Sequence, residues 1–191
     1  MKRIMIDIDD TICKGGFLKL VNDFLVEDLV IEEIDEYYVQ SYIPEEKLGE
    51  FYDYFFSHNV YNYSAIIDDA IEVIEKLSHE YEIYICSSYL VKGQYEESAI
   101  LVPQKHKWLL KNLPFIDPSN FIFTSSKHII DCDIKIDDLL TNLEGTASTK
   151  LLFSSFHNDK YTDEELSKLG VRRVNSWKEI EKLLLNQENN R

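Results

Sequence analysis

The sequence predicts an α/β fold, in which a Rossmann-like parallel sheet has helices on both faces and a small helical cap is inserted after the first strand. Three observations support this prediction. From residue 64 onward, short β-favouring runs alternate with segments whose apolar residues recur at helical spacing. These strand-like runs end in polar residues. About half of the aromatic residues lie between residues 13 and 63, in a region with a helical pattern.

Composition limits the possible functions. The chain has 191 residues, of which 45% are hydrophobic and 29% charged, and these proportions predict one well-cored globular domain. Its formal net charge of -15 repels nucleic-acid backbones and anionic membranes, which argues against both as partners. The three cysteines lack zinc or disulfide spacing, and no apolar stretch has the length of a membrane helix, so we expect a soluble cytoplasmic protein. Cys86, within an apolar strand, is expected to be buried and inert.

The first predicted strand ends in a cluster of acids. Residues 2–8 form a short apolar run that ends in Asp7, Asp9 and Asp10. Alternation along a strand places Asp7 and Asp9 on the same face. Two carboxylates this close repel each other unless a cation or hydrogen bonds compensate. The cluster is therefore either a polar junction between strand and loop or part of a site, and Asp10 is expected to face outward or to cap a helix.

The residues that follow predict a helical cap. Apolar residues at helical spacing predict a helix over residues 17–38, and a proline followed by two glutamates starts a second helix over residues 44–57. We expect residues 14–63 to form the cap, and residues 1–13 and 64–191 to form the α/β core. Most aromatic rings of the cap should pack in its own interior, and one to three should face a ligand.

The rest of the chain alternates between helix and strand. Ser64 is expected to cap the first helix of this part, and Ser176 with Glu179 predicts a capping box for the last one. The polar tail, residues 186–191, is expected to be frayed. The predicted helices cover residues 64–77, 103–113, 163–169 and 177–185, and the predicted strands cover residues 81–86, 121–124, 133–136, 150–153 and 171–174.

Polar residues stand at the ends of four predicted strands. In a parallel sheet these ends meet at one edge, where ligands bind. Each cluster alone has a simple explanation as a surface lysine, a loop hydroxyl or a turn. Together they supply the parts of phosphoryl transfer, namely a nucleophilic carboxylate, a proton-transferring carboxylate, oxygen ligands for Mg²⁺, and a hydroxyl and an ammonium for phosphate. The residues are Asp7 and Asp9, Ser87 and Ser88, Lys127, and Asp137 and Asp138.

These clusters resemble the four-motif signature of the haloacid dehalogenase superfamily of phosphohydrolases. Within that superfamily the chain most resembles the 5′(3′)-deoxyribonucleotidases and their bacterial relatives. Two positions depart from the nucleotidase pattern: Ser87 stands where threonine is common, and Asp10-Thr11 stands where glycine and a β-branched residue are usual. The narrower likeness rests on Gly15-Gly16-Phe17-Leu18, on Ile85-Cys86-Ser87-Ser88, on Lys127 ten residues before Asp137, and on a Lys-x-x-Trp stretch at Lys105 and Trp108.

The resemblance implies catalytic and metal-binding roles. Asp7 would be the nucleophile and a Mg²⁺ ligand. Asp9 would be the general acid and base, and its backbone carbonyl would also bind the metal. Asp138 would bind Mg²⁺ directly, with Asp137 beside it as a further ligand or one layer behind. Lys127 would hold the phosphate and offset the charge of Asp7.

The resemblance also implies substrate contacts. Ser87 would bind phosphate together with Ser88, and Lys105 and Phe17 are further candidates for substrate contacts. The helical cap would close over the site and exclude water other than the attacking molecule. The five histidines show no ligand spacing, so no chemistry is expected of them.

The sequence therefore predicts a Mg²⁺-dependent phosphomonoesterase that acts through an aspartyl-phosphate intermediate and dephosphorylates (deoxy)ribonucleoside monophosphates. One alternative is a phosphatase for another small phosphate ester, such as a sugar phosphate. An alternative of a different class is a non-catalytic phosphate-binding or regulatory domain on the same scaffold. The presence of Asp7, Asp9, Lys127 and Asp138 together speaks against the latter. The resemblance also suggests a homodimer.

Overall fold

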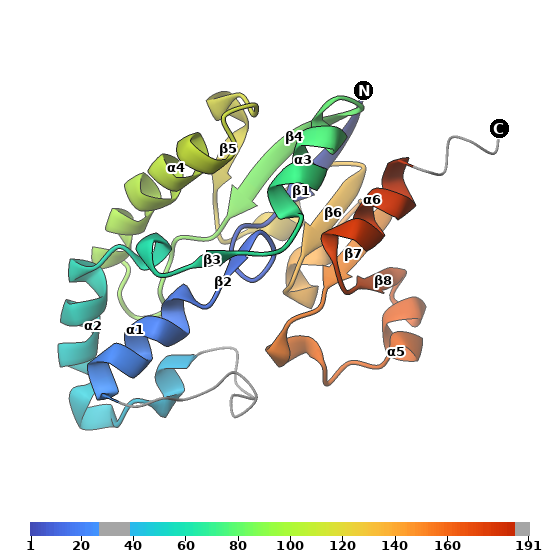
Figure 1. The fold of residues 1–191 in the computed structure, drawn as a ribbon. Coiled ribbons are helices and arrows are strands. Elements are labelled where there is room, and N and C mark those ends of the chain that lie inside the picture. The colour runs from blue at the N-terminus through green and yellow to red at the C-terminus, as the bar shows by residue number, and fades with distance from the viewer. Residues whose placement is uncertain (27–38, 186–191) are drawn as a thin grey trace.

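Six parallel strands form the centre of the protein. The computed structural model describes residues 1–26 and 39–185, and Figure 1 shows how its elements are arranged. The strand order is β5-β4-β1-β6-β7-β8, and every neighbouring pair is parallel. The first strand therefore lies inside the sheet, between β4 and β6. The strands are β1 (Lys2–Ile6), β4 (Tyr81–Ser87), β5 (Phe121–Phe123), β6 (Ile134–Asp137), β7 (Thr149–Phe153) and β8 (Val171–Val174).

Three helices cover one face of this sheet, namely α3 (Ala70–Ser78), α4 (Leu101–Asn112) and α6 (Trp177–Leu185). Their apolar side chains pack against the isoleucines of β1 and β4 in the main hydrophobic cluster. Helices α3 and α6 lie side by side (Figure 1). Trp177 at the start of α6 is fully buried, and its indole N–H donates to the backbone oxygen of Thr11 over 2.8 Å. Helix α6 therefore also holds the loop that follows β1.

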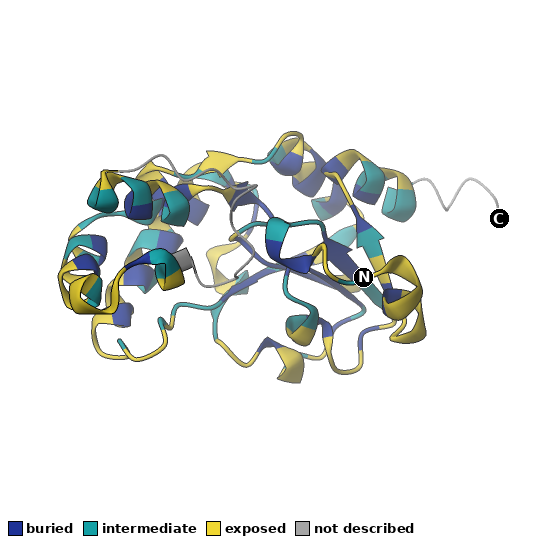
Figure 2. Ribbon diagram, turned by 90° about the horizontal axis from the view of Figure 1, so that it is seen from below, coloured by how far each residue is buried: buried dark blue, intermediate teal, exposed yellow. Residues whose placement is uncertain are grey.

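The opposite face of the sheet is covered by one short helix and two turns. Helix α5 (Asp163–Lys168) packs Leu166 against Leu152 of β7. Nearer the middle of the sheet, the 3₁₀ turns Lys127–Ile129 and Leu140–Leu143 contact each other, and the second of them contacts β6. Figure 2 shows the buried strands between more exposed outer segments. The predicted α/β fold with helices on both faces is confirmed, with the larger share of helix on one face.

A second hydrophobic cluster lies apart from the sheet, around α1 (Gly16–Leu25) and α2 (Leu48–Ser57) (Figure 1). Aromatic rings fill much of it, and the rings of Phe17 and Phe55 are 4.8 Å apart. Leu101, in the first turn of α4, also belongs to this cluster, although later residues of α4 belong to the main one. Helix α4 therefore takes part in both hydrophobic cores.

A small antiparallel ribbon joins the two ends of the segment predicted as a cap. It consists of β2 (Cys13–Lys14) and β3 (Ala65–Ile66). The cap at residues 14–63 as a separate subdomain stays a prediction, but the ribbon lies at both of its predicted boundaries. Among the described residues, no helix combines the length and the apolar character that a bilayer crossing requires.

The predicted helix over residues 17–38 is too long. Helix α1 ends at Leu25, because Val26 adopts a left-handed backbone conformation with φ 58, and its amide donates back to Asn22. A left-handed residue cannot continue a right-handed helix. Residues 27–38, which the prediction also included, lie outside the described residues.

The predicted helix cap at Ser64 is also wrong. The residues after Ser64 form β3, and α3 begins only at Ala70, after Asp69 in a left-handed conformation. The hydroxyl of Ser64 instead donates to the backbone oxygen of Val60 over 3.1 Å. The apolar residues from residue 66 onward do have helical spacing, but the first of them pairs with β2 as part of β3, so the helix begins later.

The remaining predicted elements are confirmed within a few residues. The helix predicted from residue 44 begins with the 3₁₀ turn Glu45–Lys47 and continues as α2. At the start of α6, the Ser176 hydroxyl accepts from the Glu179 amide over 3.2 Å. The carboxylate of Glu179 reaches back to the amide of Asn175 over 3.0 Å, one residue before the position that the capping box predicts.

Candidate active site

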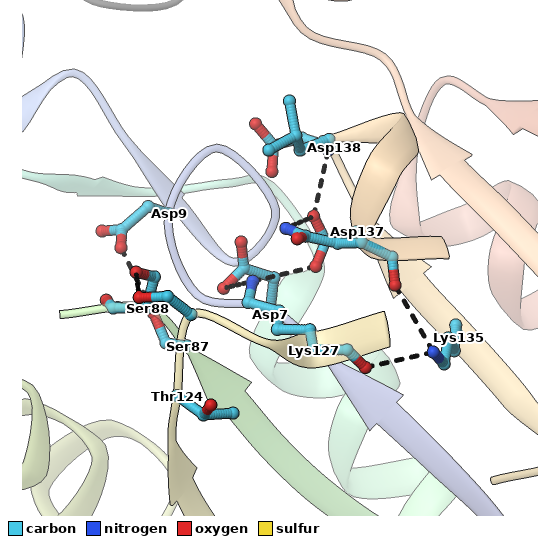
Figure 3. Close-up of polar contacts among 12 residues, drawn as sticks. Asp7, Asp9, Ser87, Ser88, Thr124, Lys127, Lys135, Asp137 and Asp138 are labelled. Carbon is cyan, nitrogen blue, oxygen red and sulfur yellow. Dashed lines mark hydrogen bonds and ion pairs between the residues drawn. The ribbon is translucent and has the colours of Figure 1, made fainter. Parts of the chain in front are cut away.

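A buried lysine connects two carboxylates at the centre of the sheet edge (Figure 3). Asp7 follows β1, and Asp137 ends β6, the neighbouring strand. Lys127 Nζ lies 2.7 Å from Asp7 Oδ1 and 2.9 Å from Asp137 Oδ2. All three side chains are at most 8% exposed. Burial disfavours the charged lysine, but the two carboxylates outweigh it and raise the pKa of Lys127.

The loop after β1 turns sharply, so that the acids of the first cluster diverge. The backbone oxygen of Ile8 accepts from the amides of Ile12 and Cys13 over 2.8 Å and 3.0 Å. Asp10 has a left-handed backbone with φ 52, a conformation that aspartate tolerates better than most residues. The loop leaves Asp7 beside Lys127 and places Asp9 against a different set of partners.

Asp9 is held by two donors. Lys105 Nζ, on α4, lies 2.5 Å from Asp9 Oδ2, and the Tyr61 hydroxyl donates to Asp9 Oδ1 over 2.8 Å. Lys105 Nζ also donates to Ser87 Oγ over 2.8 Å, so one ammonium joins the loop after β1 to the end of β4. Burial alone would raise the pKa of Asp9, but Lys105 and then Tyr61 outweigh burial and lower it.

The serines lie at the end of β4. Ser87 is buried, and its hydroxyl is 3.4 Å from Asp9 Oδ2. The amide of Thr124, after β5, donates to the backbone oxygen of Ser87 over 3.1 Å and fixes this turn (Figure 3). Ser88 is half-buried, and its hydroxyl lies 2.6 Å from Ser125 Oγ.

The two acids after β6 differ in their surroundings. Asp137 is fully buried, and in addition to Lys127 its carboxylate accepts from the Leu139 amide over 3.0 Å and from Asn142 Nδ2 over 2.9 Å. Asp138 Oδ2 instead lies 2.7 Å from His157 Nε2. Burial lowers the pKa of His157 to about 4, so the ring is neutral at pH 7.

Three of these carboxylates could hold a metal ion. Oxygen atoms of Asp7, Asp137 and Asp138 all lie within 4.8 Å of one another. Burial raises the pKa of Asp7 to about 6 and, together with repulsion from Asp137 and Asp7, raises that of Asp138 well above its usual value. Asp7 Oδ1 is buried and accepts no hydrogen bond beyond its ion pair with Lys127. Crowded carboxylate oxygens of this kind suit a hard cation such as Mg²⁺.

A cavity of about 560 Å³ opens above this cluster. Every predicted site residue of the sheet edge except Asp137 lines this cavity, and so does Phe17, which was predicted as a substrate contact. The polar part of the lining includes Asp7, Asp9, Ser87, Ser88, Lys105, Lys127 and Asp138, and the aromatic part includes Phe17, Phe55, Tyr61, Tyr89 and Phe156.

Three residues have a place in the site that the sequence did not predict. Asp10 was expected to face outward or cap a helix, but it lines the cavity, and burial with repulsion from Asp9 raises its pKa to about 7. His157 contacts Asp138, although no histidine showed ligand spacing in the sequence. Ligand atoms of Asp10, Asp138 and His157 lie within 4.8 Å of one another and form a second group that could hold a metal ion. Tyr61 stands in the aromatic-rich segment, where nothing distinguished it from its neighbours.

Known proteins resemble the chain over nearly its whole length. The sequence profile of the family described as 5′ nucleotidase, deoxy (pyrimidine), cytosolic type C protein matches residues 1–189. A Staphylococcus aureus (strain Mu50) protein provisionally named 5′(3′)-deoxyribonucleotidase is 28% identical over 186 residues, which cover 96% of each chain.

Solved structures share the fold at low sequence identity. A haloacid dehalogenase-like hydrolase from Streptococcus pneumoniae superposes with a TM-score of 0.60 at 14% identity, over 98% of this chain and 99% of the other. A Bacillus subtilis protein provisionally named as a hydrolase of the same type, and solved bound to magnesium, gives 0.53 at 14% identity over 96% and 98%. The chain therefore belongs to the 5′-nucleotidase family whose profile it matches, and it is a phosphomonoester hydrolase with a haloacid dehalogenase-like fold.

Proposed function

We propose that this enzyme removes phosphate from (deoxy)ribonucleoside monophosphates in a Mg²⁺-dependent reaction with an aspartyl-phosphate intermediate. The observation that carries the proposal is the convergence of Asp7, Asp9, Ser87, Lys127 and Asp138 on a single cavity. These side chains come from four strand ends, and their types match the needs of phosphoryl transfer. The name of the Staphylococcus aureus relative supports the choice of substrate.

The reaction would proceed in two steps. A carboxylate oxygen of Asp7 attacks phosphorus, the bond from phosphorus to the nucleoside oxygen breaks, and Asp9 gives its proton to that oxygen. Asp9 then takes a proton from water, whose oxygen attacks the same phosphorus and releases Asp7 and inorganic phosphate. In the second step Asp9 must be ionised to accept a proton, and its lowered pKa favours the ionised form. In the first step Asp9 must be protonated, and a dianionic phosphate beside it favours the protonated form because like charges repel.

The remaining polar residues would bind phosphate. Lys127 would hold phosphoryl oxygens while it offsets the charge of Asp7, and the hydroxyl of Ser87 would donate to another oxygen, with Ser88 beside it. Lys105 already donates to Ser87, so its ammonium lies next to the same position. These groups are buried or half-buried, and their electrostatic effect is stronger there than in water.

Mg²⁺ would be held by Asp7, Asp138 and the backbone carbonyl of Asp9. Asp137 would stand behind them, because Lys127, Asn142 and the Leu139 amide already occupy its oxygens. When bound, the ion offsets the charges of the carboxylates and the phosphate and so permits two anions to approach each other. The magnesium in the related Bacillus subtilis structure supports this choice of cation.

The aromatic lining of the cavity supports a nucleotide over a smaller ester. Phe17, Tyr89 and Phe156 line the same cavity as the acids, and a flat base could lie against these rings. The volume of about 560 Å³ falls within the usual range for small-molecule sites. The word cytosolic in the family description supports a cytoplasmic location. The homodimer stays a prediction, to be measured by the mass of the protein in solution.

A substrate panel tests the proposal. Purified protein with MgCl₂ is given deoxyribonucleoside and ribonucleoside monophosphates, phosphorylated at the 5′ or 3′ position, and sugar phosphates at matched concentrations. We expect the highest kcat/KM for a nucleotide, no turnover by Asp7→Asn, and an acid-stable phosphoryl label on the wild-type protein but not on that variant. A preference for sugar phosphates would favour the alternative function, a phosphatase for another small phosphate ester. No phosphate release from any compound would favour a non-catalytic domain.

A further inference from the structure

A buried lysine in the middle of β6 has no place in the reaction described above. Lys135 is fully buried, and it points to the face of the sheet that lacks α3, α4 and α6. Its ammonium donates to four backbone oxygens: to Glu144 over 2.7 Å, to Lys127 over 3.1 Å, to His128 over 3.4 Å and to Asn142 over 3.5 Å. A buried charge is costly unless it is well satisfied, so these four acceptors explain how the ammonium is tolerated.

The four acceptors belong to two turns that carry the site. Lys127 and His128 lie in the 3₁₀ turn Lys127–Ile129, whereas Asn142 and Glu144 lie in or just after the 3₁₀ turn Leu140–Leu143. The oxygen of Lys127 also accepts from the amide of Ile130 over 3.1 Å. A carbonyl oxygen has two lone pairs, so it can accept from the ammonium as well. The ammonium of Lys135 therefore ties two separate turns to the strand between them.

The same two turns are tied a second time through Asp137. Lys127 Nζ donates to Asp137 Oδ2 over 2.9 Å, and Asn142 Nδ2 donates to Asp137 Oδ1 over 2.9 Å. Lys127 and Asn142 thus donate to the carboxylate of Asp137 through their side chains, and their backbone oxygens accept from Lys135. Figure 3 shows Lys127 between Asp137 and Lys135. Lys127, Asp137, Asn142 and Lys135 therefore form a closed ring of hydrogen bonds. Lys127, the candidate for phosphate binding, is held on both sides by this ring.

A glycine keeps the two turns close. Gly145, which follows the second turn, has φ +97, and a Cβ at this position would lie 2.5 Å from the backbone oxygen of His128. A side chain here would therefore be strained and would also push the first turn away. The same oxygen accepts from Lys135, so the glycine and the ammonium both depend on the close approach of the two turns.

We propose that Lys135 is a positioning residue, which sets the location of Lys127 and Asp137 by fixing the backbone of the two turns. The inference rests on the proposed function in so far as Lys127 binds phosphate. Without the ammonium, four backbone oxygens lose their donor, and the turns are free to separate. Lys127 would then no longer lie between Asp7 and Asp137, and phosphate binding should weaken.

The test measures the affinity for inorganic phosphate in the presence of MgCl₂ by calorimetry. Lys135→Met removes the charge and keeps the length of the side chain, and Lys135→Arg keeps a charged donor. Gly145→Ala leaves Lys135 intact but disturbs the same contact between turns. Leu77→Ala is the matched control, because it removes buried side-chain volume from the main hydrophobic cluster on the other face of the sheet, whose described members include no residue of either turn. Circular dichroism establishes the temperature range in which each variant is folded.

We expect Lys135→Met and Gly145→Ala to bind phosphate about tenfold or more weakly than the wild type, with a smaller loss for Lys135→Arg. Leu77→Ala should be destabilised yet bind phosphate within about twofold of the wild type. Wild-type affinity in Lys135→Met would overturn the inference, as would an equal loss in Leu77→Ala. If Lys135→Met does not fold, the phosphate affinities of Gly145→Ala and Lys135→Arg decide, and wild-type affinity in Gly145→Ala would then overturn the inference.

The proposed function can fail separately from this inference. A wild type that binds phosphate but hydrolyses no nucleotide refutes the nucleotidase proposal, and the variants still decide whether Lys135 positions the phosphate site. A wild type that binds no phosphate refutes the role of Lys127 and with it the inference about Lys135.

Discussion

Replacing Asp7 by asparagine should abolish turnover and yet stabilise the metal-free protein at neutral pH. Asp7 is buried with 8% of its side chain exposed, and Asp137 and Asp9 repel its charge, so burial and repulsion raise its pKa to about 6 although Lys127 opposes them. The folded protein therefore binds the proton of Asp7 more tightly than the unfolded chain does. The stability that this proton contributes is full below the ordinary pKa of 3.8 and is lost as the pH rises through about 6.

The size of the effect follows from these two values. The difference between 3.8 and about 6 corresponds to about 3 kcal/mol at most. An asparagine cannot ionise, so the free energy of unfolding of Asp7→Asn, relative to the wild type, should rise by roughly 2 to 3 kcal/mol between pH 4 and pH 7.5. For a protein of this length that corresponds to roughly 5–10 °C in Tm. The other titrating acids and His157 are present in both proteins, so their contributions largely cancel in the difference.

Urea unfolding with EDTA at several pH values measures this difference. The exposed Asp68→Asn variant is the control, because with a net charge of -15 the loss of any acid relieves some repulsion. Asp68→Asn therefore measures the effect of removing one negative charge from the surface. Saturating Mg²⁺ should stabilise the wild type at pH 7.5 and Asp7→Asn much less. The reasoning fails if Asp7→Asn is the less stable protein at pH 7.5 without metal, or if its gain equals that of Asp68→Asn at every pH.

Further predictions concern the partners of the acids and the aromatic lining. His157→Ala should weaken Mg²⁺ binding about 10- to 100-fold in calorimetry, because it removes a buried donor 2.7 Å from Asp138, and His157→Gln, which keeps a donor, should recover part of the loss. Lys105→Met should lower kcat about tenfold or more while Mg²⁺ affinity stays near that of the wild type, because the ammonium holds Asp9 rather than the metal cluster. Phe17→Ala should raise KM for nucleotides by about tenfold and leave KM for a small phosphate ester nearly unchanged, since about 1 kcal/mol or more is expected of one aromatic contact.

The parallel sheet could be predicted because its signals are local. Each strand is a short β-favouring run bounded by turn residues, and the last strand, residues 171–174, was predicted with its observed bounds. The errors arose where a distant segment decided the structure. Residues 65–66 have the periodicity of a helix, but they pair with residues 13–14, and no local pattern contains that pairing.

The site could be predicted in so far as its residues stand at strand ends. Asp7 and Lys127 follow from the rule that ligands bind at the carboxyl edge of a parallel sheet. Tyr61 comes from a 3₁₀ turn between β2 and β3, and only tertiary packing brings it to the acids. His157 lies in a 3₁₀ turn soon after β7, as Lys127 lies in one soon after β5, so its place at the same sheet edge was a usable signal. Lys135 interrupts an apolar strand, which was a usable signal, because a lysine inside a buried parallel strand must find acceptors beyond its own strand.

Helix α4 limits how the specificity of this enzyme could be redesigned by exchanging caps between relatives. Its first turn contributes Leu101 to the cluster around α1 and α2, its second presents Lys105 to Asp9, and its third places Trp108 in the sheet core. A chimera cut at residues 14 and 63 would keep a Leu101 that fits the original α1 and α2. A graft should therefore include the first turn of α4 while retaining Lys105, or the new segment will change the position of Asp9 along with the aromatic lining of the cavity.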